Sequence, residues 1–306
     1  MLYGFDIGGT KTEIAVYDEG LKLRFNKRIP TVTDDLERLI QNLHRLIDEA
    51  SQSVKAPSGI GIGIPGVIRA DDESLICANV LCLDGQTLQP ILEEQFKLPV
   101  RIENDANCFV LSEAIGGAGQ DYKNLFGAIL GTGVGGALCI DKTLYQGANN
   151  LAGEWGHTPL PWSFHRLTQD KVPVVKCGCG LTGCLDNYLS GRGLSFIDKH
   201  LNGTSRNAEE LLVEARKNRP DAIQSLNCYL ELLACALGAI INILDPDAIV
   251  IGGGLSNAPE LYQKLPALIA KYCLPINKPP AILKARFGDS GGVRGAALLH
   301  YSQATG

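Results

Sequence analysis

The sequence predicts an α/β protein with two lobes, in which strands alternate with helices. The segment "YGFDIGGTKTEIAVYD" at 3–18 has the pattern of a strand, a glycine turn and a second strand. The segment "NLFGAILGTGVGGALCIDKTL" at 124–144 repeats that pattern about 125 residues later. Two such hairpins, each opening one half of the chain, indicate a duplicated architecture with a cleft between the lobes. Two unrelated hairpins with glycine turns are the alternative.

Composition excludes several classes of protein. The chain has 306 residues, 45% of them hydrophobic and 20% charged, which excludes general disorder. Its formal net charge of -5 argues against sequence-independent binding to nucleic acid, which needs a basic surface. The first residues, "MLYGFDIGGTK", lack the pattern of a signal peptide. The longest apolar stretch, 230–254, is interrupted at 245–247 by "DPD", so we expect a buried helix and strand there and a cytoplasmic protein without a membrane partner.

The first half of the chain shows a helix followed by two strands. Residues 34–50, "DDLERLIQNLHRLIDEA", carry apolar side chains at helical spacing, with two aspartates at the favourable N-terminal end. The segment "GIGIGIPG" at 59–66 predicts a buried strand that enters a turn, and "PVRIENDAN" at 99–107 predicts a strand that enters a helix. We place the lobe boundary near residue 118, in "IGGAGQD".

The second half continues the alternation. The segment "NAEELLVEARKN" at 207–218 opens with an Asn-x-x-Glu pattern, which resembles a capping box. A strongly apolar helix is predicted at 222–244, a strand and a glycine loop in "DAIVIGGGLS" at 247–256, and a helix at 258–272. The tail "GGVRGAALLHYSQ" at 291–303 reads as a last helix. The expected organisation is therefore an N-terminal lobe at 1–118, a C-terminal lobe at 119–290, and a helix in 291–306 that packs back on the first lobe.

Three glycine loops at strand ends indicate a nucleotide site. They are "DIGGTK" at 6–11, "GTGVGG" at 131–136 and "GGGLS" at 252–256. Glycine lets backbone N–H groups approach an anion closely, because no Cβ is in the way. None of the three fits the P-loop or the dinucleotide fingerprint. Asp6 is positioned to hold the Mg²⁺ of a nucleoside triphosphate, and Thr10 and Lys11 to reach phosphate oxygens.

Polar residues elsewhere offer acid–base chemistry. Transfer of a phosphoryl group to a hydroxyl needs a carboxylate that accepts the proton, and "ENDAN" offers Asp105 at a strand-to-helix turn, beside Asn104. Asp is also a common N-cap, so a purely structural role is the alternative for Asp105. Glu154 and His157, in "GEWGH", form a second polar pair, although an isolated His is more often structural.

The ten cysteines fall into two groups. Three of them, Cys177, Cys179 and Cys184, form a C-x-C-x4-C pattern twenty residues after His157. This pattern is consistent with a metal site or a redox centre, and C-x-C spacing is less typical of a reactive thiol pair than C-x-x-C. The other seven lie in apolar surroundings, where a free Cys acts as a small hydrophobe: Cys77, Cys82, Cys108, Cys139, Cys228, Cys235 and Cys273.

Six motifs, in order and spacing, resemble the ROK family of bacterial sugar kinases. They are "DIGGTK", "GIGIPG", "NDAN", "GTGVGG", "GEWGH" and "CGCGLTGCLDNYLSGRG", and the resemblance covers essentially the whole chain. It implies an actin- and hexokinase-like (ribonuclease H-like) fold, with ATP in the cleft between the lobes and a structural zinc. It also makes a homodimer plausible.

The resemblance implies a role for individual residues. Asp105 would be the base, and His157, Cys177, Cys179 and Cys184 would hold Zn²⁺, the closed ligand set of a structural site, with His165 as the nearest rival ligand. The residues implied for the sugar are Gly66, Asn79, Asn104, Asp105, Glu154, His157 and Asp186. Those implied for Mg²⁺ and ATP are Asp6, Gly8, Gly9, Thr10, Lys11, Thr132, Gly133, Gly135 and Gly136, with Gly253 and Gly254 near the adenosine.

One position departs from the family pattern. The cysteine motif usually continues as Cys-x-Glu, and that Glu reaches hydroxyls near the anomeric carbon of the sugar. This chain has Cys184-Leu185-Asp186, so the carboxylate is withdrawn by one methylene. A weakened contact of Asp186 with the sugar is one expectation, and compensation by the backbone is the other.

Further matches, such as "DPDAIVIGGGLSN" and "GDSGGVRGAALLH", imply phosphorylation of N-acetyl-D-glucosamine at O6 by ATP, in the recycling of cell-wall amino sugars. Glucose, N-acetylmannosamine and fructose are the alternative sugars. The family also contains sugar-responsive repressors, but these carry a DNA-reading motif before the first glycine loop, which begins here at residue 6. A sugar-binding protein without catalysis is disfavoured by the presence of Asp105 and Asp6.

Overall fold

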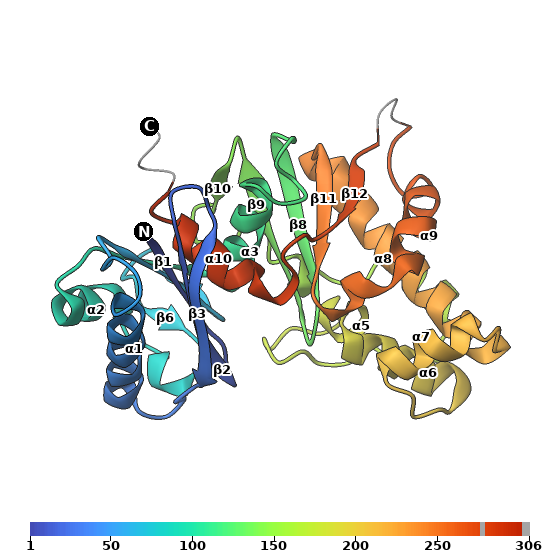
Figure 1. Ribbon diagram of the computed structural model, residues 1–306. Coiled ribbons are helices and arrows are strands. Elements are labelled where there is room, and N and C mark those ends of the chain that lie inside the picture. The colour runs from blue at the N-terminus through green and yellow to red at the C-terminus, as the bar shows by residue number, and fades with distance from the viewer. Residues whose placement is uncertain (276–278, 302–306) are drawn as a thin grey trace. The chain divides into compact units, whose positions relative to one another are not determined.

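The structure, a computed structural model, describes residues 1–275 and 279–301 and forms two compact units (Figure 1). The first unit contains 1–117, 142–152 and 289–306, and the second contains 118–141 and 153–288. The sequence analysis placed 142–152 in the second lobe. In the structure this segment belongs to the first unit, where Asn150 Nδ2 donates to the carbonyl of Ile68 at 2.9 Å.

The first unit is built on a mixed sheet with strand order β3-β2-β1-β4-β7. β1 pairs with β2 in antiparallel fashion, as the hairpin prediction required, and pairs with β4 in parallel. β7 extends the sheet in parallel beyond β4, so β1, β4 and β7 all end at one edge. The bounds are β1 (Leu2–Ile7), β2 (Lys11–Tyr17), β3 (Leu23–Pro30), β4 (Ile60–Ile64) and β7 (Val100–Asn104).

Helices cover this sheet where the sequence periodicity predicts them. In α1 (Leu36–Ser51) the N-cap is Asp35, whose carboxylate accepts from the N–H of Arg38, and the apolar stripe enters the core through Leu39 and Leu43. The remaining elements of the unit are β5 (Val67–Ile68), β6 (Leu75–Ile76), η1 (Leu81–Leu83), α2 (Leu88–Phe96), α3 (Asp105–Ala114), β10 (Thr143–Tyr145) and α10 (Gly291–Leu298), with η4 (Gly288–Ser290) leading into α10.

The last helix, α10, lies directly against the start of the chain. It packs on α3, β1 and β4, and Figure 1 shows it beside α3 and β1. Glycines permit this close approach. A Cβ at Gly295 would lie 1.7 Å from the carbonyl oxygen of Cys108, and one at Gly61 would lie 1.8 Å from that of Ala296. The expected helix at 291–303 ends earlier, at Leu298, and residues 302 and 303 lie outside the described residues.

The second unit repeats the strand arrangement of the first. β8 (Asn124–Leu130) and β9 (Val134–Ile140) form an antiparallel hairpin, β11 (Ala248–Gly252) pairs with β8 in parallel, and β12 (Ala281–Lys284) pairs with β11 in parallel. The second sheet has the order β10-β9-β8-β11-β12, which corresponds strand for strand to β3-β2-β1-β4-β7. The two similar hairpins in the sequence are therefore matched by two similar sheets.

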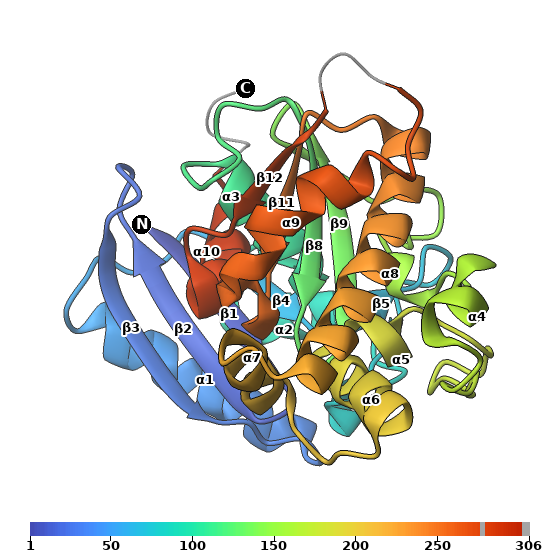
Figure 2. The same cartoon turned by 90° about the vertical axis from the view of Figure 1, so that its right-hand side faces the viewer.

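The helices of the second unit pack mainly on α8, as Figure 2 shows for α6, α7 and α9. α8 is long and apolar enough to cross a membrane by length and composition alone, but 61% of its most apolar window is buried within the protein. The predicted capping box is present: Asn207 and Glu210 each accept the other's backbone N–H at 2.9 Å. The bounds are η2 (Trp155–His157), α4 (Ser163–Thr168), α5 (Asp186–Leu189), α6 (Gly191–Asn202), α7 (Ala208–Arg216), α8 (Pro220–Leu244), η3 (Gly254–Asn257) and α9 (Pro259–Ile269).

Candidate functional site

The carboxyl edge of the first sheet gathers four of the predicted site residues. Asp6 lies near the end of β1, Gly66 follows β4, and Asn104 ends β7, with Asp105 beginning α3. The register aligns Asp6 with Gly63 and Gly63 with Glu103. Parallel strands whose ends meet at one edge therefore bring together residues that are a hundred positions apart in the chain.

Asn104 is the N-cap of α3. Its Oδ1 accepts from the N–H groups of Ala106 at 2.8 Å and Asn107 at 3.3 Å, and its Nδ2 donates to the carbonyl of Gly66 at 2.9 Å. Asp105 is the first helical residue, and its Oδ1 lies 2.8 Å from the N–H of Ala106. The N-cap role considered for Asp105 thus belongs to its neighbour Asn104. The carboxylate of Asp105 lies at the edge of the sheet and is not needed as the N-cap.

Negative charge accumulates around Asp6. Burial raises the pKa of Asp6 to about 7, and the carboxylates of Asp105 and Glu13 add to the rise. Glu13 pairs with Asp6 in register and is almost fully buried, where it accepts from Arg28 Nε at 2.6 Å. Carboxylate oxygens are the ligands that Mg²⁺ prefers, and this donor set fits such an ion.

The first glycine loop is a tight turn between β1 and β2. The N–H of Gly8 donates to the carbonyl of Lys11 at 2.9 Å, and the N–H of Thr31 donates to the carbonyl of Thr10 at 3.1 Å. The exposed residue Asn79 packs against Gly9, where an added Cβ would lie 3.1 Å from the Asn79 carbonyl oxygen. The structure therefore places Asn79 beside the loop that the sequence assigns to phosphate.

The second glycine loop, between β8 and β9, is held by the segment that follows the cysteine motif. The N–H of Val134 donates to Asp186 Oδ1 at 2.7 Å, and the N–H of Gly191 donates to the carbonyl of Gly131 at 2.8 Å. Arg192 Nε donates to the carbonyl of Thr132 at 2.9 Å. Asp186, expected at the sugar, thus has one oxygen engaged in bracing this loop.

Two other glycines of the same loop lie against an aromatic ring. Trp155 Nε1 donates to the carbonyl of Gly135 at 2.7 Å, and the indole ring packs on Gly136, where a Cβ would lie 2.5 Å from Trp155 Cδ1. Trp155 begins η2 and is buried. The loop is therefore fixed on both sides by neighbouring segments of the second unit.

The third glycine loop, after β11, approaches the second closely. Gly253 has φ of 78°, and a Cβ there would lie 2.5 Å from the carbonyl oxygen of Leu130, so no other residue fits without strain. Next to these loops lies a cavity of about 650 Å³, a size suited to a small-molecule ligand. The lining consists of Gly131, Thr132, Gly191, Ala208, Glu209, Leu212, Arg216, Gly254, Leu255, Asn257 and Ala258.

This cavity unites predicted residues with ones that the sequence reasoning missed. Thr132 and Gly254 were expected at a nucleotide and are both in its wall. Ala208, Glu209 and Leu212, from the start of α7, were not expected there. Their segment showed a capping box, which predicts where a helix begins but carries no information about what its first turn faces.

Glu154 is the N-cap of η2, and His157 is the last residue of that turn. Burial raises the pKa of Glu154, and the nearby imidazole of His157 opposes part of that rise. His157 is half-buried, and its N–H donates to the carbonyl of Glu154 at 3.1 Å. This polar pair is thus held in a short, fixed turn.

The cysteine motif closes on His157. One ligand atom from each of His157, Cys177, Cys179 and Cys184 lies within 4.8 Å of the others. His157 Nδ1 is 3.8 Å from Cys177 Sγ, and the sulfurs of Cys179 and Cys184 are 3.6 Å apart. Tetrahedral zinc with Zn–S bonds of about 2.3 Å places sulfurs roughly 3.8 Å apart, so the cluster has the donor set and spacing of such a site.

The chemistry of the cluster also favours a cation. Burial raises the pKa of the Cys184 thiol to about 12, and the sulfurs of Cys179 and Cys177 add to the rise. A metal ion offsets the repulsion between thiolates and binds them in the deprotonated form. The rival ligand His165 faces elsewhere, with Nδ1 3.0 Å from Asp170 Oδ1. All ten cysteines are free thiols in the structure.

Glu103 is a buried residue of the site that the sequence reasoning did not single out. Its Oε1 accepts from the N–H of Asn104 and from Asn107 Nδ2, both at 2.8 Å, and its Oε2 accepts from Gln146 Nε2 at 2.5 Å. The carboxylate therefore joins the turn that carries Asp105 to the segment 142–152. Its position inside "ENDAN" was the available signal, but the strand pattern gives no indication of which partners a side chain finds.

The comparison with known protein families agrees with these motifs. The model of the ROK family matches residues 2–303. The chain belongs to the ROK family. A curated relative, the N-acetyl-D-glucosamine kinase of Yersinia enterocolitica, is 44% identical over 303 residues, which cover 99% of this chain and 100% of the relative.

Solved ROK structures share the fold. The ROK hexokinase from Thermus thermophilus is 28% identical with a TM-score of 0.86, covering 99% of both chains. A ROK family glucokinase from Streptomyces griseus, in complex with glucose and AMPPNP, is 26% identical with a TM-score of 0.77, covering 97% of this chain and 98% of that one. The chain thus has the α/β ROK kinase fold with mixed sheets, as the sequence predicted.

We expect Glu103→Gln to lower the free energy of unfolding by about 1–3 kcal/mol, the cost of leaving a buried polar group unsatisfied. The carboxylate accepts three N–H donors, whereas an amide has one acceptor oxygen and a competing NH₂ group. The measurement is urea unfolding of the single variant, of Gln146→Glu and of the double variant. In the double variant the amide and the carboxylate exchange places, so positions 103 and 146 can again form a hydrogen bond. The double variant should therefore recover part of the lost stability. Unchanged stability in Glu103→Gln would contradict this role.

Proposed function

We propose that this protein is an ATP-dependent kinase that phosphorylates N-acetyl-D-glucosamine at O6, giving N-acetylglucosamine 6-phosphate for the recycling of cell-wall amino sugars. The observation that carries the proposal is the full-length relative, 44% identical, whose name is N-acetyl-D-glucosamine kinase. The placement of Asp105 and Asp6 at one edge of the first sheet supports it, because sugar phosphorylation needs a base and a site for Mg²⁺.

In this mechanism Asp105 acts as the general base. The oxygen of the 6-hydroxyl forms a bond to the γ-phosphorus, the bond from that phosphorus to the β,γ-bridging oxygen breaks, and ADP leaves. The hydroxyl proton passes to the carboxylate of Asp105. Because Asn104 caps α3 and is tied to Gly66, the residue that follows it starts from a fixed position. Pre-set geometry of this kind lowers the entropic part of the barrier.

The family resemblance assigns the remaining sugar contacts to Gly66, Asn79, Asn104, Glu154, His157 and Asp186. Carboxylates and an imidazole are suitable partners for sugar hydroxyl groups, since they accept or donate in charge-assisted hydrogen bonds. Asp186 has one oxygen on the N–H of Val134, so its other oxygen is the one proposed for the sugar.

ATP is assigned to the glycine loops. The family resemblance assigns the phosphates to Gly8, Gly9, Thr10, Lys11, Thr132, Gly133, Gly135 and Gly136, and the adenosine to the neighbourhood of Gly253 and Gly254. The cavity of about 650 Å³ beside Thr132 and Gly254 has a volume suited to the adenosine part. Asp6 would hold Mg²⁺, which supplies charge neutralisation at the phosphate oxygens.

The Cys and His cluster is proposed as a structural zinc site. His157, Cys177, Cys179 and Cys184 would fill all four positions, which leaves none for a reacting water. Nδ1 of His157 is the ring nitrogen on the side of Cys177, so Nε2 is the one proposed for a sugar hydroxyl. The proposal further takes the protein to act in the cytoplasm on small molecules, as a homodimer, with neither nucleic acid nor membrane as a partner.

Glucose is the second candidate substrate, because two solved ROK structures with 28% and 26% identity are named a hexokinase and a glucokinase. The test is an ADP-release assay with N-acetylglucosamine, N-acetylmannosamine, glucose and fructose at saturating ATP. We expect the highest kcat/KM for N-acetylglucosamine. A higher kcat/KM for glucose or fructose would show that the proposed substrate is wrong, although the proposed kinase activity would stand. No ADP release with any of the four sugars would refute the kinase activity itself.

We expect Asp105→Asn to lower kcat by about 10²–10⁴-fold, the usual range for loss of a general base. The amide preserves the shape of the side chain but cannot accept the proton, so melting temperature and sugar binding should change little. The matched control is Asp72→Asn, an exposed aspartate whose carboxylate accepts from Ser74, outside the strands that form the sheet edge. If Asp105→Asn kept more than half of the wild-type kcat, Asp105 would not be the base.

Elemental analysis should find about one zinc per chain, the number that one closed ligand set binds. Cys179→Ser should reduce the zinc content, lower the melting temperature and weaken sugar binding together, because His157 belongs to both the metal and the sugar contacts. Cys273→Ser and His165→Ala are controls, since neither residue is in the cluster. A zinc-free preparation with full sugar affinity would refute the coupling, and a wild-type protein without zinc would refute the site.

A further inference from the structure

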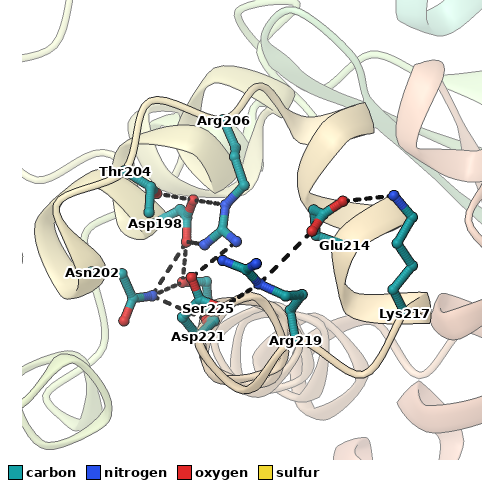
Figure 3. Close-up of polar contacts among 9 residues, drawn as sticks. All are labelled: Asp198, Asn202, Thr204, Arg206, Glu214, Lys217, Arg219, Asp221 and Ser225. Atoms are coloured by element: carbon teal, nitrogen blue, oxygen red, sulfur yellow. Dashed lines mark hydrogen bonds and ion pairs between the residues drawn. The ribbon is translucent and has the colours of Figure 1, made fainter.

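A buried carboxylate, Asp198 of α6, organises the polar network drawn in Figure 3. Its side chain is fully buried. Arg206 donates to it through Nε at 2.9 Å and Nη2 at 2.8 Å, and Ser225 Oγ donates at 2.7 Å. Thr204 Oγ1 and Asn202 Nδ2 donate to it as well. We call the set Asp198, Asn202, Thr204, Arg206, Asp221 and Ser225 the clamp.

The clamp fixes the short connection 203–207 between α6 and α7. Arg206 comes from this connection, and besides its fork on Asp198 it places Nη1 3.1 Å from Asp221 Oδ2, in the first turn of α8. Thr204 comes from the same connection and points to the same carboxylate (Figure 3). Through these two side chains the connection is tied to two different helices.

The energetics favour a single position for this connection. A fully buried charge is costly unless it is paired and hydrogen-bonded, so any shift that withdraws Arg206 removes the ion-pair partner of Asp198 and leaves it only neutral donors. Burial on its own raises the pKa of Asp198, but the hydrogen bonds from Arg206, Thr204 and Ser225 outweigh burial and hold the pKa below its ordinary value. The carboxylate thus stays charged and keeps its partners.

The connection ends where the wall of the 650 Å³ cavity begins. Arg206 precedes Asn207, the N-cap of α7, and the first turns of α7 present Ala208, Glu209 and Leu212 to the cavity. α6, which carries Asp198, starts at Gly191, another residue of the same wall. The clamp residues themselves are absent from the lining. They join the middle of α6 to the residue that precedes the N-cap of α7, and the N-terminal ends of these two helices form this side of the cavity.

We propose that the clamp is a positioning device for the nucleotide: the Asp198–Arg206 pair sets the start of α7 against α6 and thereby the shape of the cavity that receives the adenosine. Asp198 and Arg206 are positioning residues, because neither reaches the cavity. The inference rests on the proposed function for the identity of the ligand. The property that the clamp controls is the affinity of the protein for the nucleotide.

Other ion pairs of α7 provide a contrast. Lys217 and Glu214 pair at 2.9 Å, and Arg219 lies 3.8 Å from Glu214, all beyond the first turn of the helix (Figure 3). The side chains of Lys217 and Arg219 are largely exposed, so these pairs contribute little to stability. Neither Lys217 nor Glu214 lines the cavity or belongs to the clamp, which makes Lys217→Gln a matched control, whereas Arg219 also lies 3.6 Å from Asp221 of the clamp.

The experiment uses the full chain and three clamp variants, Thr204→Val, Arg206→Lys and Arg206→Gln. Thr204→Val removes one hydrogen-bond donor to Asp198. Arg206→Lys keeps the positive charge but cannot form the bidentate hydrogen bond, and Arg206→Gln removes the charge. Binding of the non-hydrolysable analogue AMPPNP is measured by calorimetry without sugar, and the KM values for ATP and sugar are measured separately. Tyr272→Phe, which removes a 2.8 Å hydrogen bond to Glu231 in the same unit, controls for a general loss of packing. All measurements are made well below the lowest melting temperature.

We expect the dissociation constant for AMPPNP to rise by about 10-fold in Arg206→Gln and about threefold in Arg206→Lys and Thr204→Val, as small misplacements remote from the chemistry do. The KM for ATP should follow it, while the KM for sugar stays within about twofold and both controls match wild type. Unchanged nucleotide affinity in folded Arg206→Lys and Thr204→Val would overturn the proposal, as would an equal rise in the KM for sugar.

The failure of the clamp and the failure of the proposed function are distinguishable, because AMPPNP binding needs no sugar. A wild-type protein that binds AMPPNP but phosphorylates none of the sugars would refute the function, and the AMPPNP affinities of the clamp variants would still decide the clamp. A wild-type protein that does not bind AMPPNP would overturn both.

Discussion

The side chain of Asn104 carries the constraint on which the first unit's site depends. One amide group caps α3 through Oδ1 and holds the turn after β4 through Nδ2, so a helix and two strands meet on a single residue. Asp105 is the next residue, so the contacts of Asn104 also fix where Asp105 lies. Glu103 supports the same turn from the buried side by accepting from the backbone N–H of Asn104. Three consecutive residues thus have three roles: Glu103 supports the turn, Asn104 caps the helix, and Asp105 is the proposed base.

The second unit reaches a comparable rigidity by different means. Its glycine loop has few side chains of its own to hold it, and the restraint comes from Asp186, Gly191 and Arg192, which bond to its backbone. These three follow closely on Cys184. The cysteine cluster, the braced loop and the start of α6 are therefore linked through one continuous segment, and a cation in the cluster would stiffen a stretch of chain that extends to the cavity wall.

Local signals in the sequence carried much of the fold. The helix at 34–50, the capping box at Asn207 and the two hairpins depend on residues close together in the chain, and the structure confirms each. The C-x-C-x4-C motif and His157 converge although α4 lies between them in the chain, and an antiparallel bridge pairs Pro159 with Cys184. Conversely, the partnership of Glu103 with Gln146 and the exposure of α7's first turn to the cavity depend on how distant elements pack. Periodicity carries no information about such contacts. The same reason applies to 142–152: a hairpin pattern predicts β8 and β9 but not that the segment after them groups with the first unit, although β10 within it is a strand of the second sheet.

The close packing of α10 on β1 and β4 has a consequence for how the chain folds during its synthesis. Gly295, Gly61 and Gly4 allow this helix to touch β1, β4 and α3 almost backbone to backbone, so the core of the first unit includes residues from both ends of the sequence. A ribosome synthesises from the N-terminus, and every residue of 153–288 emerges before α10 exists. The second unit therefore has its complete sequence available while the first still lacks a wall of its core. Until α10 has been synthesised, β1 and β4 lack this packing partner, and we expect the first unit to be the part of the chain that a chaperone protects.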